Sequence, residues 1–312
     1  MNKNAGISFT NLALIFSFSI SFAYADHAEK SQFFEEITIV GNKDRANTVA
    51  GSAHFISDAD LEVFNYADIQ QILRQVPGVN LQLEDGYGLR PNIGIRGVQT
   101  ERSGRIMLLE DGVPIAPAPY AASSAYYFPT AGRMYSVEVL KGPAAITEGP
   151  NTIGGAINMV STPIPEETEG KVVAEVGGNS TTRVHAAYGS TNSDGFGYLI
   201  ETHQWKSDGF QSIDGSNSGT GLDIKDYTLK LGYAPVDSRH AFELKYQYAE
   251  QDSNQSYLGI TDADFDLNPY RRYSVSQNDL MTTEHKQLIL RHDFSIRDNL
   301  NMTTTAYNND HA

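Results

Sequence analysis

The sequence of 312 residues contains no cysteine and only one tryptophan. Without cysteine, neither a disulfide framework nor a thiolate metal site can form. Basic residues are also scarce, since 23 Lys and Arg stand against 38 Asp and Glu, which gives a formal net charge of -15. This balance argues against a nucleic-acid partner, because neutralising phosphates requires basic patches.

Catalytic motifs are missing as well. The eight histidines include no HExxH pair, no GxSxG elbow occurs, and the glycine-rich run near Gly149 lacks the GK[ST] ending of a phosphate-binding loop. The sequence therefore predicts that this protein is not an enzyme.

Long apolar runs are absent except near the N-terminus. Lys3 precedes the run Leu12–Ala23, and Ala23-Tyr24-Ala25 has the small-x-small pattern of a cleavage site. We expect residues 1–25 to be a signal peptide and the mature chain to begin near Asp26. A retained helical anchor is the alternative, but it would need about 20 apolar residues.

Residues 37–165 have the mixed texture of a small globular domain. Apolar residues recur at helical spacing between Tyr66 and Val76, with Asp68 expected in the first turn and Pro77-Gly78 ending the helix.

After Pro165 apolar and polar residues alternate, as in strands with one apolar face. Tyr227, Leu229 and Leu231 face one side, while Thr228 and Lys230 face the other. The predicted strands are residues 171–177, 181–189, 196–206, 225–234, 240–250, 285–295 and 300–309. A soluble β-sandwich would show the same alternation.

The connections between these strands favour a membrane barrel. Short turns at 192–195, 236–238 and 297–299 alternate with long loops at 206–224 and 251–284. Transmembrane barrels have short turns on one side and long loops on the other. A barrel that encloses a domain of this size needs roughly 22 strands. The sequence predicts only about 7, so we expect the chain to be C-terminally truncated.

Several motifs occur in one order along the first region. They are Asp68–Leu73, Gly94–Gly97 (GIRG), Leu109–Pro114 (LEDGVP), Val137–Pro143 (VEVLKGP) and Gly149–Val160. In this order they resemble the plug domain of TonB-dependent outer-membrane receptors. The resemblance implies an α+β plug domain at residues 41–165, followed by an antiparallel transmembrane β-barrel that begins at residues 166–312, in the outer membrane of a bacterium.

The segment at residues 26–40 resembles the periplasmic extension of that family. Its β-prone end, Glu36, Ile37, Thr38, Ile39 and Val40, looks like a TonB box. Such a segment is an untethered strand that adds to the sheet edge of a partner, and the resemblance implies that this partner is TonB with its inner-membrane energising complex. An ordinary first strand of the plug is the alternative.

The resemblance implies that Arg96 and the basic residue before Gly142-Pro143, here Lys141, face barrel carboxylates and lock the plug. The family usually has Arg at the second position. Lysine lacks the bidentate fork of arginine, so we expect this half of the lock to be weaker. Local pairing of two surface charges is the alternative.

The segment from Ala116 to Pro129 resembles the plug-apex loop of ferric-citrate-type receptors. Its predicted ligand-binding residues are Tyr120, Tyr126, Tyr127, Ser123 and Ser124, with Arg90, Arg102 and Arg105 nearby to meet an anionic chelate. Ala121-Ala122 departs from the glutamine-rich family pattern and puts citrate itself in question. The tyrosines could instead pack the plug against the barrel.

The resemblance implies active uptake of a ferric chelate, such as ferric citrate or another siderophore, with iron carried only inside the ligand and no resident cofactor. A non-iron cargo such as cobalamin or a glycan, or a barrel enzyme or adhesin, is the alternative. We expect no metal site: Asp262, Asp264 and Asp266 imitate a calcium loop, but Leu267 stands where that loop requires glycine.

Overall fold

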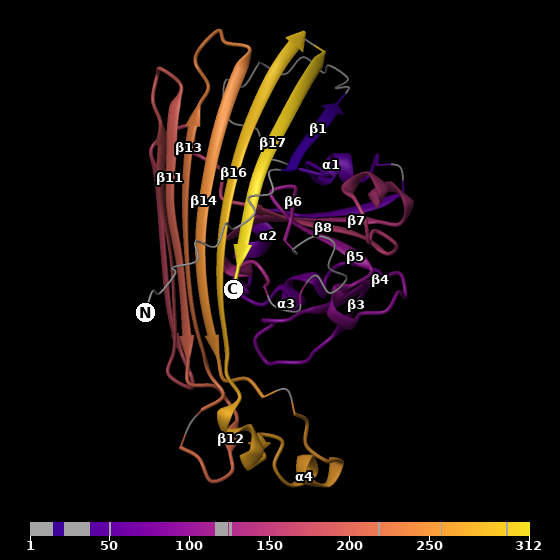
Figure 1. The fold of residues 1–312 in the computed structure, drawn as a ribbon, viewed down its shortest axis with the longest axis vertical. Helices are drawn as coiled ribbons and strands as arrows, with labels where there is room; N and C mark the ends of the chain where they lie inside the picture. Colours follow the sequence, from indigo (N-terminus) through magenta and orange to yellow (C-terminus); the bar gives the residue numbers. More distant parts are fainter. Residues whose placement is uncertain are drawn as a thin grey trace, which may run out of the picture.

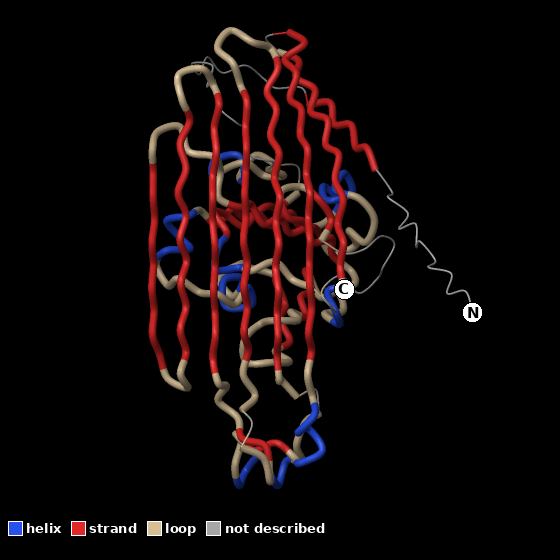
Figure 2. The backbone as a smooth tube through the Cα atoms, turned by 60° about the vertical axis from the view of Figure 1, so that its left-hand side comes forward, coloured by secondary structure: helices blue, strands red, loops and turns tan. Residues whose placement is uncertain are grey.

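The computed structural model describes residues 15–21, 38–49, 51–115, 124, 127–217, 219–256, 258–297 and 299–312. A small mixed α/β part lies against one side of a tall, curved sheet, as Figures 1 and 2 show. We call the first part the plug and the second the wall sheet. Among the residues just given, no helix is long and apolar enough to cross a membrane.

The plug is built on a five-stranded sheet with the strand order β2-β7-β8-β5-β6. These strands are β2 (Ser52–Ile56), β7 (Met134–Lys141), β8 (Gly155–Ser161), β5 (Ile106–Glu110) and β6 (Val113–Pro114). A two-stranded sheet adds β3 (Val79–Gln82) and β4 (Asn92–Ile95). The short helices are α1 (Lys43–Ala46), α2 (Asp58–Glu62), α3 (Ile69–Leu73), η1 (Glu101–Ser103), η2 (Ala131–Arg133) and η3 (Pro143–Glu148).

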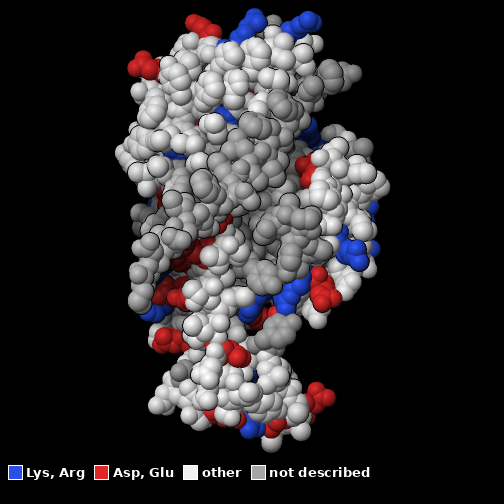
Figure 3. Space-filling view, viewed as in Figure 1, with Lys and Arg blue, Asp and Glu red and all other residues white. Residues whose placement is uncertain are grey.

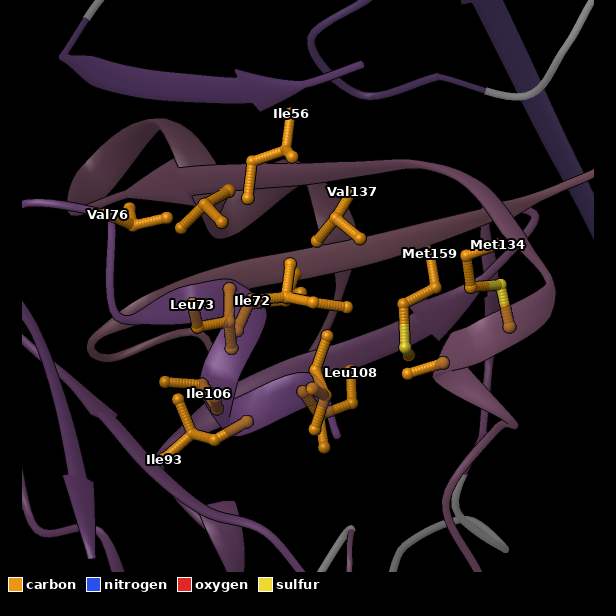
Figure 4. Packing of buried hydrophobic residues seen from close by; sticks show 14 of the residues in the cluster. Ile56, Ile72, Leu73, Val76, Ile93, Ile106, Leu108, Met134, Val137 and Met159 are labelled. Carbon is orange, nitrogen blue, oxygen red and sulfur yellow. The ribbon is translucent and has the colours of Figure 1, made fainter. Parts of the chain in front are cut away.

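The core of the plug lies between the sheet and helix α3. Every residue of β5 and β8 is buried, which explains why most of their residues are apolar. Helix α3 turns Ile69, Ile72 and Leu73 into the same cluster, which Figure 4 shows from close by. The plug therefore follows the usual rule of apolar residues inside.

Helix α3 is shorter than the stretch predicted from spacing. The prediction ran from Tyr66 to Val76, whereas the helix covers Ile69–Leu73. Asp68 is extended and is the N-cap rather than a first-turn residue, because its side chain accepts a hydrogen bond from the Gln70 amide at 2.7 Å.

The wall sheet has eight strands in the order β1-β17-β16-β14-β13-β11-β10-β9, and all neighbours are antiparallel. All seven predicted strands are present, each within four residues of its predicted ends. They are β9 (Glu169–Gly177), β10 (Thr181–Thr191), β11 (Phe196–Ser207), β13 (Leu222–Tyr233), β14 (His240–Ser253), β16 (Met281–Arg297) and β17 (Leu300–His311).

The eighth strand, β1 (Ile15–Ser21), comes from the apolar run near the N-terminus and pairs with β17. The sequence predicts that this run belongs to a signal peptide that is removed from the mature chain. An unpaired strand edge offers a row of free backbone groups, and an apolar, β-prone segment satisfies them. That residues 1–25 are a signal peptide stays a prediction.

The two faces of the wall sheet separate a membrane barrel from a soluble sandwich. The face toward the plug carries buried polar side chains, among them Glu201, His203, Asp226, Lys245, Gln247 and Gln287. The opposite face exposes large apolar side chains, among them Val176, Ile200, Tyr227, Leu229, Tyr246 and Leu290. A soluble sandwich buries its apolar face, whereas a transmembrane barrel turns it outward to lipid.

The exposed face is also banded along the strands. At the short-turn end, strand register aligns Phe196, Tyr233, Phe242 and His292 in one row. Eight residues further along β13, Lys225 lies in a charged row with Glu250 and Glu284. The nine residues of this span match the roughly 9–11 that a tilted strand needs to cross the hydrocarbon core.

The long loops form a small folded piece at the other end of the sheet, at the bottom of Figure 1. It contains β12 (Ser212–Ile213) paired in parallel with β15 (Arg271–Arg272), helix α4 (Asp262–Leu267) and η4 (Ser274–Asn278). On the face shown in Figure 3, charged side chains of both signs lie over this piece.

Candidate functional site: the contact between plug and wall

A buried ionic cluster joins the plug to the wall sheet. Arg133, at the end of η2, donates from Nη2 to Glu110 Oε1 of the plug at 2.8 Å and from Nε to Asp226 Oδ2 of β13 at 2.9 Å. Lys245 of β14 donates from Nζ to Glu110 Oε1 and to Asp111 Oδ2, both at 2.6 Å. We call these five residues the clamp.

The local fold explains how the clamp is presented. Asp111 and Gly112 both have positive φ, 49° and 74°, and form the tight turn between β5 and β6 that the Asp-Gly pair predicts. The turn brings two consecutive carboxylates to the edge of the plug. Asp111 also accepts hydrogen bonds from the Ser161 amide at 2.8 Å and the Ser161 hydroxyl at 2.7 Å, which fix its orientation.

The electrostatics keep the plug carboxylates of the clamp ionised. Burial alone would raise the pKa of Asp111, but the Lys245 ammonium outweighs it and holds the pKa well below its usual range. The pKa of Glu110 is also lowered, because Arg133 and then Lys245 overcome the effect of burial. The three carboxylates of the clamp share two cations at a buried site, and removing either cation would leave buried carboxylates without a direct ionic partner.

Tyr127, one of the predicted ligand residues, packs beside the clamp. Its ring stacks on the His285 ring of β16 with centroids 3.7 Å apart, and its hydroxyl accepts from Gln247 Nε2 at 3.1 Å. Burial raises the pKa of the Tyr127 hydroxyl well above its usual range, so it stays neutral. This is the packing of plug against barrel that the sequence had left open for the tyrosines.

The other predicted ligand residues are not brought together as one site. The buried Ser124 hydroxyl donates to the Pro91 carbonyl at 2.6 Å, which ties the apex loop to the plug. Arg102 pairs with Glu84 at 2.6 Å, and Arg90 Nη1 lies 3.1 Å from Met281 Sδ of the wall sheet.

Arg105 is exposed immediately before β5. Tyr120, Ser123 and Tyr126 lie outside the described residues. Ligand binding by the apex loop therefore stays a prediction.

The two predicted lock residues lie together at the far end of β7. Arg96 is exposed with φ of 56°, and a Cβ on Gly142 would lie 2.4 Å from Arg96 Nη1. Lys141 donates from Nζ to the Pro77 carbonyl at 2.9 Å, and burial followed by the Arg96 charge lowers its pKa. The eight-residue step from Arg133 to Lys141 along the strand corresponds to about 26 Å.

The lock residues therefore lie at the end of β7 opposite Arg133, well away from the clamp. Their pairing with barrel carboxylates stays a prediction.

Sequence reasoning missed all five clamp residues. Glu110 and Asp111 were considered only as part of the strand and turn of the LEDGVP motif. The available signal was two consecutive carboxylates at the end of an apolar buried strand, since buried charges need partners. The partners could not be named, because Asp226 and Lys245 lie 93 and 134 residues from Arg133 and Asp111 in sequence.

The predicted TonB box is only partly described, since Glu36 and Ile37 lie outside the described residues. The amides of Ile39, Val40 and Gly41 donate to the Glu138 carboxylate at 2.7, 3.1 and 2.7 Å, and Val40 is fully buried. The expectation of an untethered strand is therefore wrong for residues 39 and 40, because a buried carboxylate binds their backbone. That these residues are a TonB box stays a prediction.

The long loops hold a second ionic cluster. Arg271 donates to Asp214 at 2.8 Å and to Asp264 at 2.6 Å, and the Tyr273 hydroxyl donates to Asp264 at 2.5 Å. The Tyr273 hydroxyl and then the Thr261 hydroxyl lower the pKa of Asp264. In the part of the chain that the structure describes, no group of three or more His, Asp or Glu is placed to hold a metal ion.

Comparison with known proteins now places this architecture. Residues 45–156 match the family profile of the TonB-dependent receptor plug domain, a range that includes Arg133 and both plug carboxylates of the clamp. The chain therefore contains a plug domain of the TonB-dependent receptor type. The family prediction from motif order is confirmed.

The curated relatives are transporters. The chain is 28% identical over 218 residues to the vitamin B12 transporter BtuB of Vibrio vulnificus strain CMCP6, covering 69% of this chain and 33% of that protein. It is 21% identical over 275 residues to BtuB of Vibrio cholerae serotype O1 strain M66-2, covering 84% of this chain and 44% of that protein. The chain thus spans less than half of the length of these relatives. The matched family and the curated relatives are receptors and transporters, in line with the prediction that the protein is not an enzyme.

Solved structures share the fold. The ferric citrate transporter FecA in its unliganded form matches with a TM-score of 0.72 at 22% identity, over 89% of this chain and 42% of FecA. The siderophore receptor PirA of Acinetobacter baumannii matches with a TM-score of 0.62 at 23% identity, over 83% of this chain and 40% of PirA. The prediction of a plug followed by antiparallel barrel strands is confirmed.

Proposed function

We propose that this chain is part of an outer-membrane receptor that takes up a ferric chelate with energy supplied through TonB. The observation that carries the proposal is a folded plug clamped by buried ions to a sheet whose other face is apolar. A sheet that is polar toward the plug and apolar outward suits a lipid-facing barrel with a filled interior. A filled interior blocks passage, so uptake requires the plug to move.

The orientation follows from the banded outer face. Short turns lie beside the aromatic row of Phe196, Tyr233 and Phe242, while the long loops lie beyond the charged row of Lys225 and Glu250. Because long loops of such barrels face outward and short turns face the periplasm, α4 would lie outside the cell. Export through the predicted signal peptide at residues 1–25 belongs to the same proposal.

The far end of β7 supports the predicted lock. Arg96 and Lys141 place two like charges close together, and burial followed by the charge of Arg96 lowers the pKa of Lys141. Such a pair is stabilised when a carboxylate comes to lie against it. We propose barrel carboxylates as these partners, which would hold the plug at the side opposite the clamp.

For the cargo, a ferric chelate is supported by Arg90 and Arg105, basic side chains on the plug that suit an anionic ligand, and by Tyr120 and Tyr126 of the predicted apex loop. Iron would travel inside the chelate and not as a resident cofactor. Cobalamin is the second candidate, because the curated relatives are named as vitamin B12 transporters.

Uptake in a strain that lacks its own receptors tests the cargo. Cells that produce the full-length protein are offered radiolabelled ferric citrate, a ferric catecholate, a ferric hydroxamate or cyanocobalamin. The proposal expects accumulation of one ferric chelate, and accumulation of cyanocobalamin alone would replace the first candidate by the second.

The same cells test the energy source. Deleting Glu36–Val40, or using a strain without TonB, should leave cargo binding intact and abolish accumulation. Undiminished uptake in either case would contradict the proposed mechanism. Recovery of the protein outside the outer-membrane fraction would contradict the proposed location.

A further inference from the structure

Glu138 binds the backbone of residues 39–41, in the segment that precedes helix α1. It lies in the middle of β7, is fully buried, and accepts hydrogen bonds from the consecutive amides of Ile39, Val40 and Gly41. Its fourth donor is Asn158 Nδ2 at 2.9 Å. The carboxylate is therefore satisfied by four neutral donors, three of them from the backbone of one segment.

This geometry is incompatible with strand addition. In an extended strand successive amides point to opposite sides, whereas here three in a row converge on one carboxylate, in the manner of a backbone nest. Gly41, with φ of 95°, supplies the turn. Residues 39–41 must therefore leave Glu138 before their amides can join the sheet edge of another protein.

A chain of hydrogen bonds connects Glu138 to the wall sheet. Asn158 donates to Glu138 and accepts from the Gly112 amide at 2.9 Å through its side-chain oxygen. Gly112 follows Asp111, whose carboxylate accepts from Lys245 of β14 at 2.6 Å. A shift of the Asp111-Gly112 turn against the wall would thus displace Asn158 from Glu138.

We propose that Glu138 is a latch that holds residues 39–41 against the five-stranded sheet of the plug, and that the clamp sets its strength through Asn158. The inference rests on the proposed function, because a latch has a role in uptake only if a partner binds the released segment. In the resting receptor the latch holds residues 39–41 against Glu138. A movement of the plug relative to the wall sheet weakens these hydrogen bonds.

The absence of native cysteine gives a direct test. In the full-length protein in detergent, Val40→Cys places one thiol at a buried position, and its rate of maleimide labelling reports release of the segment. Adding Glu138→Gln should raise this rate about tenfold or more, because the amide retains one acceptor and turns an N–H toward the backbone donors. Glu167→Gln, in an exposed loop, is the matched control and should leave the rate within about twofold.

Two outcomes would overturn the latch. One is a labelling rate in Glu138→Gln equal to that of the Glu167→Gln control. The other is a parallel rise at Leu108→Cys, in the plug core, because labelling would then report opening of the whole plug. Fast labelling at position 40 with continued protection at position 108 supports the proposal.

The connection to the wall is tested in the same assay. Lys245→Met should raise labelling of Val40→Cys about threefold, while Lys225→Met, on the outer face of the wall, should not. Combining Lys245→Met with Glu138→Gln should give less than the product of the two single effects, since both act on one chain of contacts. An unchanged rate in Lys245→Met, or a fully multiplicative effect, overturns the connection.

These measurements contain neither TonB nor cargo. Failure of the latch would therefore appear in the labelling rates while uptake still depends on residues 36–40. Failure of the proposed function would appear as uptake that does not need TonB, whatever the labelling rates are.

Discussion

The plug and the wall sheet follow opposite rules of burial within one chain. In the plug, Leu108 and Ile157 are buried in an apolar core. In the wall, Leu229 and Leu290 are exposed while Lys245 and Gln247 are buried. The comparison shows that the alternation of a strand does not say which face is inside. The neighbours decide it: a polar plug edge on one side and an apolar medium on the other.

The largest effect should come from breaking the contact between the two regions. Arg133→Met removes the cation shared by Glu110 and Asp226 and leaves both buried carboxylates short of a partner. We expect a loss of about 3–5 kcal/mol in the stability of the docked plug, measured by urea unfolding in detergent. Arg74→Met, at an exposed position after α3, is the control, and equal losses in the two variants would refute the role of the clamp.

The next largest effect is expected from a substitution in the apolar core of the plug. Leu108→Ala opens a cavity in a fully buried strand, and we expect a loss of about 2–5 kcal/mol in the free energy of unfolding of the plug. Leu83→Ala, at a side chain that is 53% exposed, should cost far less. Similar costs at both positions would contradict an apolar core centred on β5.

A charged substitution on the exposed apolar face of the wall sheet tests whether this face contacts lipid. Leu229→Arg places a cation in the middle of the apolar band, where we expect a loss of about 2–4 kcal/mol in the free energy of folding into lipid bilayers. Leu267→Arg, in the exposed helix α4, changes the same residue type outside the band and should have little effect. Equal tolerance at the two positions would indicate that the exposed face of the wall does not meet lipid.

The smallest effect is a pH dependence at the surface of the plug. A hydrogen bond from Lys43 and then the backbone of Ser57 lower the pKa of Asp60 from 3.8 to about 2. Because the folded pKa is below the unfolded value, the stabilising contribution is complete above about pH 4 and is lost as pH falls toward 2. The stability difference between wild type and Asp60→Asn should shrink over this window.

A Lys43→Met background is the control for this pH dependence. It should remove most of the difference between wild type and Asp60→Asn. A difference that is constant between pH 2 and 5 would contradict the assigned cause.

Local patterns predicted the elements of both regions but not their contacts. The seven wall strands and the Asp111-Gly112 turn follow from period-2 alternation and turn chemistry. Helix α3 came out shorter, because Asp68 caps the helix and so excludes the residues before it. The contact of Arg133 with Asp226 joins residues 93 positions apart, and that of Glu138 with Ile39 joins residues 99 positions apart. No local pattern carries such information.

The length of the apolar band determines how far the long loops lie from the bilayer. Strand β13 continues only three residues past the charged row at Lys225, to Leu222, and β16 begins at Met281, three residues from Glu284. In the proposed orientation, the folded loops around α4 stand clear of the bilayer. An antibody epitope inserted after Leu267 would then be stained on intact bacteria, which turns the surface of the living cell into a readout of topology.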